Sequence, residues 1–277
     1  MRTHVSDARH GAPIMVVPGL VGVVMEERVA VNPGARPAGE VTEEAAAAHV
    51  REIFDSIAPS YDLLNHLLSM GLDRRWWGRS ARSFRDVLAR PNARVLDLCC
   101  GTGDMTAALL KQRPLSAEPV TGLDFSGEML ERARKKYSGA NAVWVKGDAM
   151  HLPYADGSFD LVTAAFGFRN LTNYAEGLAE IYRVLAPGGR MGILECNQPD
   201  GLRGWGYGIY FQHVLPVVGG LISGKRAAYR YLPESVARFP RPKQMLGMMR
   251  EAGFSECAWD GYLLRAAGLY RGTKRAG

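Results

Sequence analysis

Short apolar runs alternate with amphipathic stretches between residues 94 and 194, and this alternation constrains the fold more than any other feature of the sequence. The runs predict strands at Arg94–Leu98, Val120–Leu123, Ala142–Val145, Leu161–Ala165 and Arg190–Leu194, and the stretches predict helices at Met105–Gln112, Gly127–Tyr137 and Tyr174–Leu185. Short apolar strands that alternate with helices indicate βαβ units and a parallel sheet. We expect the Pro187-Gly188-Gly189 turn to end the last of these helices before its strand begins.

The segment before these units is predicted to be helical. Thr42 has the character of a helix N-terminus, and the alanine-rich run after it extends to Phe54. Leucines at helical spacing predict a second helix over Tyr61–Met70. Asp73 is expected to cap a third helix, over Arg74–Leu88.

Glycine and proline recur through residues 1–41 at a density that interrupts helices and strands alike. We therefore expect a disordered tail or a mis-called translation start, with the true start near Met25. The apolar run from Ala12 to Met25 is too short to span a bilayer and is interrupted by Pro18 and Gly19. A weak membrane contact through this run is the alternative.

The charge balance and the cysteines exclude several classes of protein. Lys and Arg number 34 and Asp and Glu number 28, which gives a net charge of +6. An excess this small permits weak attraction to anionic lipid, but it does not indicate nucleic-acid binding. The four cysteines form neither a metal-binding pattern nor a disulfide framework, so we expect no metal and a reducing, cytoplasmic location.

Glycines and carboxylates follow the first three predicted strands. Gly101 and Gly103 come directly after the first strand and let the backbone turn tightly and approach a ligand. Asp124 ends the second strand, where an acidic side chain meets ribose hydroxyls in doubly wound folds, and Asp148 follows the third. The carboxyl ends of parallel strands meet at one edge, so these groups should line one crevice.

The ligand of this crevice is not predicted to be a dinucleotide. Thr106 and Ala107 stand near the place where a dinucleotide fingerprint has its third glycine. Asp97 and Asp104 would repel a pyrophosphate, and they suit a cationic ligand. S-adenosyl-L-methionine has adenine, ribose, an ammonium and a sulfonium but no phosphate, so it fits this pattern.

Longer sequence blocks resemble the menaquinone/ubiquinone biosynthesis C-methyltransferases, a family of class I S-adenosylmethionine-dependent methyltransferases. The resemblance covers about residues 50–274. It rests on the blocks YDLLNHLLSMGLDRRWW, VLDLCCGTGD, GLDFSGEML, GDAMHLPYADGSFD, FGFRNLTNYAEGLAEIYRVLAPGGR, LECNQP, FQHVLPVVGGLISG, YRYLPESVARFP and MMREAGF. It implies an α/β, Rossmann-like sheet of seven mostly parallel strands with helices on both faces. It further implies a methyltransferase domain over residues 42–277, with a helical lid over 42–90, a core over 91–277 and a helical insertion near 201–240.

The glycine loop, the carboxylates and the resemblance together give the expected cofactor-binding set: Asp97, Gly101, Thr102, Gly103, Asp124, Phe125, Asp148 and Ala149. This sequence departs from the family at two places. The family commonly has Asn where Asp148 stands, an exchange that keeps a hydrogen-bond acceptor. Some members add a Ser contact where this chain has Ala165, and that contact is not carried over.

Methyl transfer to a quinol ring needs a proton acceptor or a cation that stabilises the developing phenolate. Arg169 follows the fourth strand and is a candidate for that cation, and Asn170 is a candidate to orient the quinol hydroxyl. The alternative for Arg169 is an ion pair with Asp160 or another loop carboxylate. Tyr61 is a candidate to cover the site as part of the lid, and its alternative is a plain contact between helices.

Other residues carry weaker expectations. A nucleophilic role for the adjacent Cys99 and Cys100 is not expected, and His213 is more readily a buried histidine than a base. Glu195 ends the fifth strand, where it would either reach the substrate or be ion-paired. The apolar stretch Trp205–Ile222 packs into the core or forms a wall for a polyprenyl tail.

The leading hypothesis is an enzyme that methylates a carbon of a polyprenylated quinol, most readily demethylmenaquinol in menaquinone biosynthesis. A ubiquinone-pathway C-methyltransferase, an O-methyltransferase of another small aromatic metabolite and a non-catalytic cofactor-binding scaffold stay open. We expect peripheral contact with the inner face of the cell membrane, favouring the Trp205–Ile222 stretch with its flanking cations for that contact. No nucleic-acid partner is expected, and a homodimer is left open.

Overall fold

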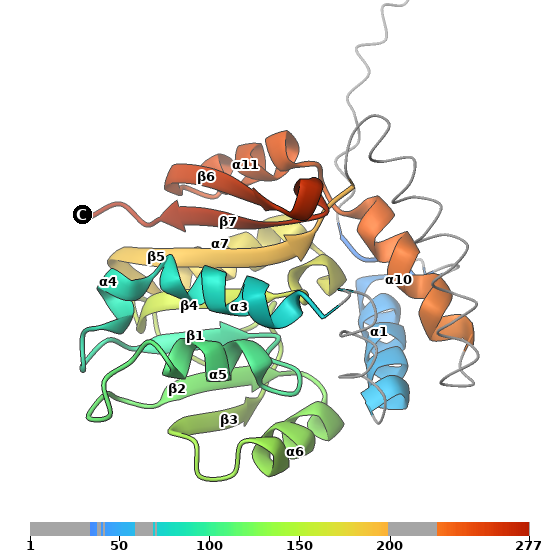
Figure 1. Ribbon diagram of the computed structural model, residues 1–277. Coiled ribbons are helices and arrows are strands. Elements are labelled where there is room, and N and C mark those ends of the chain that lie inside the picture. The colour runs from blue at the N-terminus through green and yellow to red at the C-terminus, as the bar shows by residue number, and fades with distance from the viewer. Residues whose placement is uncertain are drawn as a thin grey trace, which may run out of the picture. The chain divides into compact units, whose positions relative to one another are not determined.

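A computed structural model of the chain describes residues 34–37, 40, 42–58, 69, 71–198 and 226–276. Its sheet has seven strands in the order β3-β2-β1-β4-β5-β7-β6 (Figure 1). The first five pair in parallel, and β7 runs antiparallel to both of its neighbours. The strands are β1 Val95–Leu98, β2 Val120–Asp124, β3 Ala142–Lys146, β4 Phe159–Ala165, β5 Leu185–Cys196, β6 Ser255–Tyr262 and β7 Ala267–Thr273.

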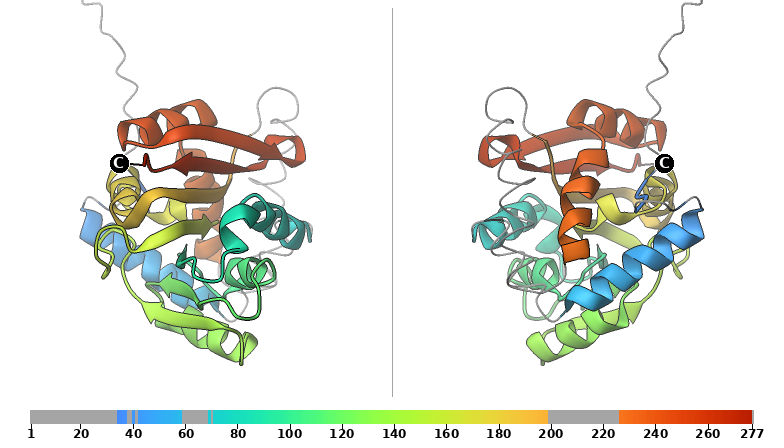
Figure 2. Two further views of the ribbon diagram at one scale, coloured as in Figure 1. Left: turned by 90° about the vertical axis from the view of Figure 1, so that its left-hand side faces the viewer. Right: turned by 90° about the vertical axis from the view of Figure 1, so that its right-hand side faces the viewer.

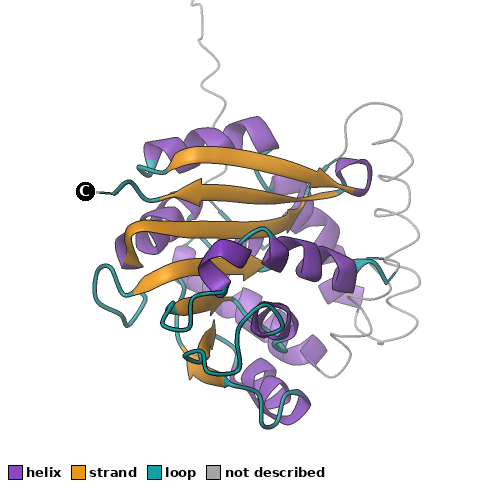
Figure 3. Cartoon of the chain, turned by 60° about the vertical axis from the view of Figure 1, so that its left-hand side comes forward, coloured by secondary structure: helices purple, strands orange, loops and turns teal. Residues whose placement is uncertain are grey.

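Helices cover both faces of this sheet (Figure 3). They are α1 Glu43–Ile57, α3 Asp73–Arg82, α4 Arg85–Leu88, α5 Asp104–Leu110, α6 Gly127–Lys136, α7 Tyr174–Val184, α10 Arg226–Arg238 and α11 Pro242–Glu251, with short 3-10 helices η2 Phe168–Asn170 and η4 Leu263–Arg265. Buried side chains of α3, α4 and α5 form one core layer with the strands, and those of α7 and α11 form the other. The α/β architecture expected from the sequence is therefore confirmed.

The five strands predicted in the βαβ region are all present, as are the three helices between them. The helix expected at Thr42 also forms, and its N-cap is Thr42, whose hydroxyl accepts a hydrogen bond from Ala45 N at 3.2 Å. The predicted helix Tyr61–Met70 lies, apart from Ser69, outside the described residues.

The third helix of the N-terminal segment differs from its prediction. Leu72, and not Asp73, is its N-cap, and the predicted continuous helix is divided into α3 and α4. The division falls at Phe84, which is fully buried and packs against the backbone of Gly192 in β5. Tertiary packing of this one ring therefore overrides the local preference for a longer helix.

The Pro187-Gly188-Gly189 turn also behaves differently from its prediction. Helix α7 ends at Val184, and the turn lies inside β5, which begins at Leu185. Two backbone hydrogen bonds hold the turn to Lys274: Gly188 N donates to Lys274 O at 2.9 Å, and Lys274 N donates to Gly189 O at 2.8 Å. The glycines thus form an irregularity in a paired strand, since the chain end supplies their partners.

Two helices lie beyond the carboxyl edge of the parallel strands, α1 and α10 (Figures 1 and 2). They meet in a small apolar cluster of Ala35, Val50 and Tyr231. That α1 acts as a lid over the site stays a prediction; α3 and α4 pack on the face of the sheet. Within the described residues, no helix is both long and apolar enough to cross a bilayer.

Candidate active site

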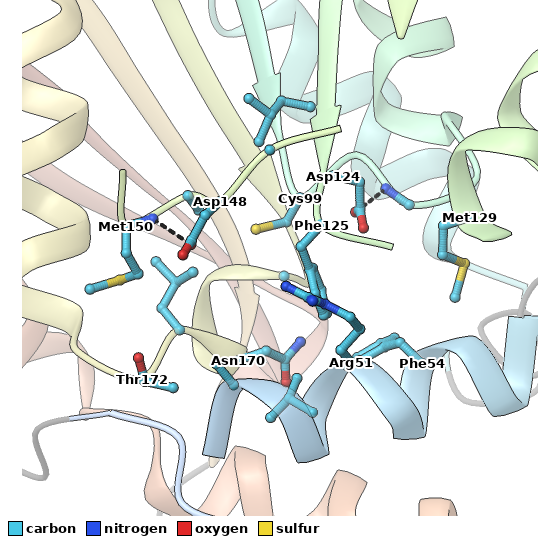
Figure 4. Close-up of a pocket in the computed structure, with 18 of the residues that line it drawn as sticks. Arg51, Phe54, Cys99, Asp124, Phe125, Met129, Asp148, Met150, Asn170 and Thr172 are labelled. Carbon is cyan, nitrogen blue, oxygen red and sulfur yellow. Dashed lines mark hydrogen bonds between the residues drawn. The ribbon is translucent and has the colours of Figure 1, made fainter. Parts of the chain in front are cut away.

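A cavity opens at the carboxyl edge of β1, β2, β3 and β4, and α1 closes one side of it (Figure 4). Its walls are predominantly apolar. The end of β2, the segments after the four strands, the start of α6 and the inner side of α1 supply the lining residues: Ala47, Val50, Arg51, Phe54, Cys99, Gly101, Leu123, Asp124, Phe125, Met129, Gly147, Asp148, Ala149, Met150, Phe166, Gly167, Asn170, Leu171 and Thr172.

Asp124 is the buried carboxylate of this cavity, with 4% of its surface exposed. Its Oδ2 accepts a hydrogen bond from Gly101 N at 2.8 Å, and its Oδ1 accepts one from Ser126 N at 2.9 Å. Burial raises its pKa to about 6, against the opposing effect of these backbone donors. Each oxygen keeps a further lone pair, so the group can accept two more hydrogen bonds from a diol.

The glycine loop shapes the floor between β1 and α5. Gly103 has φ +90° and is the N-cap of α5, and a side chain there would meet the Trp144 ring at 2.6 Å. Only glycine combines this conformation with this close approach. Thr102 lies at a second, smaller cavity that shares Cys99 and Phe166 with the first.

Asp97 lies beneath the loop and has no exposed surface. Its two oxygens accept hydrogen bonds from Thr106 at 2.6 Å and Thr163 at 2.9 Å, so the carboxyl joins α5 to β4. Burial raises its pKa to about 7. Asp97 is absent from the cavity lining, and its predicted contact with the cofactor stays a prediction.

The third carboxylate occupies the rim. Asp148 is exposed, and its Oδ1 accepts a hydrogen bond from Met150 N at 2.9 Å. Ala149 beside it is buried and lines the cavity. Asp104, which was expected to add negative charge near the ligand, is engaged by Lys136 at 2.9 Å and by Tyr137 OH at 2.6 Å.

Asn170 faces the cavity from η2. Its Oδ1 accepts a hydrogen bond from Tyr231 OH at 3.0 Å, so its amide nitrogen is the end left to donate to a ligand. Tyr231 comes from α10 and is 5% exposed, and burial raises its pKa to about 12. A neutral phenol therefore fixes the orientation of this amide.

Arg169 is buried behind the cavity wall and forms an ion pair with Glu195 of β5 at 3.0 Å. It also donates to the carbonyl oxygen of Phe166 and to Ser235 Oγ. Asp160, the partner considered from the sequence, pairs instead with Arg90 and Arg94. Arg169 therefore forms an ion pair, as the alternative from the sequence expected, but its partner is Glu195 and not Asp160.

Helix α1 contributes residues that the sequence analysis missed. Arg51 reaches over the Phe125 ring, 5.6 Å from its centroid, and Phe54 meets the same ring edge-on at 6.3 Å (Figure 4). Asp55 accepts a hydrogen bond from Ser126 Oγ, which ties α1 to the loop after Asp124. The amphipathic pattern of α1 shows which of its sides is buried, but no local signal identifies this partner.

Tyr61, His213 and the stretch Trp205–Ile222 lie outside the described residues. Burial raises the pKa of the Cys99 and Cys100 thiols well above their usual range, which disfavours a thiolate nucleophile. In the part of the chain that the structure describes, no group of His, Cys, Asp and Glu could hold a metal ion.

The cavity matches S-adenosyl-L-methionine in its donor set. The buried carboxylate of Asp124 could accept hydrogen bonds from a ribose diol, and Phe125, Met129 and Ala149 could form apolar walls for an adenine. Carboxylates and aromatic rings suit a cationic sulfonium. The strand order and this site together define an S-adenosyl-L-methionine-dependent methyltransferase.

Comparison with known proteins narrows the class. A model of the ubiE/COQ5 methyltransferase family matches residues 41–274, and the chain belongs to that family. The demethylmenaquinone methyltransferase of Deinococcus radiodurans is 47% identical over 86% of this chain and 97% of its own length. That of Thermus thermophilus is 52% identical over 73% and 91%. The ubiquinone/menaquinone biosynthesis C-methyltransferase UbiE of Geotalea daltonii is 42% identical over 81% and 96%.

Solved structures of lower identity share the fold. The [4+2]-cyclase SpnF has a TM-score of 0.61 at 18% identity, over 89% of this chain and all of that one. A SAM-dependent methyltransferase from Thermotoga maritima has a TM-score of 0.56 at 22% identity, over 82% of this chain and all of its own.

Proposed function

We propose that this chain transfers a methyl group to a ring carbon of demethylmenaquinol, a polyprenylated quinol of menaquinone biosynthesis. The observation that carries the proposal is the position of the FGFRN segment, because Phe166, Gly167 and Asn170 line the same cavity as Asp124. A cofactor subsite and a polar group for an aromatic substrate thus share one cavity. The names of the related proteins support the quinol as that substrate.

The cofactor is proposed to be held by Gly101, Thr102, Asp124, Phe125 and Ala149, with Asp148 at the rim. When bound, S-adenosyl-L-methionine supplies an activated methyl group. The protein's own contribution is to orient the acceptor and to exclude water from the apolar cavity. In this proposal, Asn170 donates a hydrogen bond from its amide nitrogen to a quinol oxygen and so presents the neighbouring ring carbon.

The proposal gives Arg169 and Tyr61 different roles. The Arg169 charge is balanced by Glu195, so we infer that it acts mainly by holding η2, and with it Asn170, in place. Tyr61 is proposed to cover the bound substrate, as expected from the sequence. We also infer a peripheral contact with a membrane, because a polyprenyl chain keeps the substrate in the bilayer.

The direct test uses the purified full chain with labelled S-adenosyl-L-methionine and a short-chain demethylmenaquinol. We expect label in the quinone extract, with mass and NMR analysis placing the methyl group on carbon. Asn170→Ala should lose most of this turnover yet bind S-adenosylhomocysteine as wild type does. Asn173→Ala is a matched control, because Asn173 caps α7 and does not line the cavity.

The outcomes separate the competing hypotheses. Label on a phenolic oxygen would mean that the enzyme is an O-methyltransferase. Label only in a benzoquinol of the ubiquinone pathway would mean that demethylmenaquinol is not the substrate. Binding of S-adenosylhomocysteine without turnover on any quinol would favour the non-catalytic scaffold. A deletion strain that accumulates a demethylated naphthoquinone would independently support the proposal.

A further inference from the structure

Helix α3 presents a face of arginines to solvent. Its buried residues Asp73, Trp77, Ser80 and Ala81 lie on one side. Helical spacing places Arg75, Arg79 and Arg82 together on the opposite side, and all three are exposed.

These arginines lack carboxylate partners. Among the residues that the structure describes, no carboxylate forms an ion pair with any of the three. Asp86 and Asp260 pair with other arginines: Asp86 with Arg190 at 2.7 Å and Asp260 with Arg271 at 2.7 Å. The face therefore carries uncompensated positive charge.

The turn between β6 and β7 presents apolar side chains to solvent. Leu263 is 42% exposed and Leu264 is 61% exposed. Their φ angles are +34° and +52°, and Arg265 follows with +72°, so three consecutive non-glycine residues occupy the left-handed region. This conformation is unfavourable for leucine, and residues held in it cluster at functional surfaces. Exposed leucines in a strained turn indicate a contact outside the fold of the chain.

The arginine face and the turn adjoin each other. Tyr262, the last residue of β6, shares a hydrogen bond with Ser80 at 3.2 Å, and the Arg79 guanidinium lies 4.4 Å above its ring. We call this combined feature the arginine–leucine surface; it consists of Arg75, Arg79, Arg82, Leu263 and Leu264.

This surface lies beside the cavity. Ala267, which follows the turn, pairs with Cys196 at the carboxyl end of β5. On α3, the Trp76 ring packs 6.1 Å from the ring of Phe166, a residue that lines both cavities. A partner on the arginine–leucine surface would therefore be next to the wall of the active site.

We propose that the arginine–leucine surface is where this protein rests on an anionic phospholipid bilayer. Guanidinium groups bind lipid phosphates through paired hydrogen bonds, and the two leucines enter the interface beneath the headgroups. The choice of a bilayer over a protein partner rests on charge complementarity and on the proposed function, because a prenylated quinol is reached from the membrane. The segments considered for this contact from the sequence, Ala12–Met25 and Trp205–Ile222, lie outside the described residues.

The test measures co-sedimentation of the full chain with phosphatidylcholine vesicles that do or do not contain phosphatidylglycerol. Wild type should bind only the anionic vesicles, less at high salt. Arg75→Glu/Arg82→Glu should weaken this binding by at least roughly tenfold. Leu264→Asn should also weaken it while folding normally, because asparagine adopts positive φ more readily than leucine.

Matched controls lie away from the surface. Leu115→Asn removes a leucine that is fully exposed elsewhere, and Arg250→Glu reverses an exposed arginine near the end of α11; both should bind vesicles as wild type does. All surface variants should keep wild-type turnover on a soluble short-chain quinol and lose it on quinol embedded in vesicles.

Unchanged vesicle binding by both surface variants, or equal loss in the controls, would overturn the proposal. So would wild-type chain that binds neither kind of vesicle, or that elutes as a dimer which the surface variants dissociate. Failure of the wild type to methylate the soluble quinol would instead overturn the proposed function, and the vesicle result would stand by itself.

Discussion

Asp124 combines burial with a ligand-binding task, and this combination makes cofactor affinity depend on pH. Burial raises its pKa to about 6, and in the proposed site its ionised form accepts hydrogen bonds from both ribose hydroxyls. Below that pH the binding-competent fraction falls, so the affinity for S-adenosylhomocysteine should drop roughly tenfold between pH 7.5 and pH 5. Calorimetric titration across this range measures the effect.

The matched variant for this prediction is Asp124→Asn. It should bind roughly 10- to 150-fold more weakly at pH 7.5, because it loses an acceptor of charge-assisted hydrogen bonds. Its affinity should not change with pH. A wild-type affinity that is equally independent of pH would remove Asp124 from the cofactor site.

Tyr231 is expected to act on turnover through Asn170. Tyr231→Phe removes the donor that orients the amide, and one neutral hydrogen bond is worth about 0.5–1.5 kcal/mol, so kcat should fall roughly 2- to 13-fold. The affinity for S-adenosylhomocysteine should stay unchanged. Steady-state kinetics with the soluble quinol measures the split between kcat and KM.

Tyr270→Phe is the control for this substitution. It removes an equally buried phenol, one that hydrogen-bonds Asn197 and does not contact Asn170. Both variants should lose similar stability, but only Tyr231→Phe should lose turnover. Equal kinetics in the two variants would show that the orientation of Asn170 does not depend on Tyr231.

At the scale of elements, the Arg169–Glu195 pair joins η2 to β5. Breaking a buried ion pair from one side leaves the other charge uncompensated and costs about 3–5 kcal/mol. Arg169→Met should therefore destabilise the protein by that amount, and Glu195→Gln added to it should restore much of the loss. Urea unfolding of the two single variants and the double variant measures the coupling.

The same three variants also test whether Arg169 stabilises charge in the reaction, as the sequence analysis suggested. If Arg169→Met unfolds at the same urea concentration as wild type but has no turnover, the arginine stabilises charge in the reaction and the structural interpretation is wrong. If the double variant regains stability together with part of its turnover, Arg169 acts by holding Asn170 in position.

The elements that the sequence predicted well are those specified locally. The periodicity that predicts strands and helices between residues 94 and 194 depends only on residues nearby in the chain, as does the N-cap at Thr42. The structure contains all of these elements. The misplaced features depend on distant partners: Phe84 breaks a helix because it packs on Gly192, and the proline-glycine turn joins β5 because Lys274 pairs with it.

The residues of the candidate site likewise fall into two groups, those that the sequence predicts and those that only the folded structure reveals. Asp124 and Asp148 are recognisable because Asp124 ends one strand and Asp148 follows the next, and parallel strands end at one edge. The pairing of Arg169 with Glu195 depends on β4 lying next to β5, and the tie from Asp55 to Ser126 depends on where α1 docks. No spacing within the sequence encodes either contact, so both required the folded structure.

At the scale of the whole molecule, the buried carboxyl of Asp97 links stability to pH. Its pKa is about 7 in the folded chain, against about 3.9 in an unfolded chain, because burial penalises the charged form. The folded state therefore holds a proton that the unfolded state has released. The stability that this group contributes is fully present below about pH 4 and is lost as the pH rises through 7.

Asp97→Asn imitates the protonated carboxyl and keeps groups that can hydrogen-bond Thr106 and Thr163. Relative to wild type, its free energy of unfolding should rise with pH, by up to about 4 kcal/mol between pH 4 and pH 8. Asp156→Asn, which changes an exposed carboxylate, should show no such trend. Urea unfolding of wild type and the two variants across this pH range measures these differences in the free energy of unfolding. An Asp97→Asn difference that stays constant or falls as the pH rises would mean that the two threonines, and not burial, govern the charge of this carboxyl.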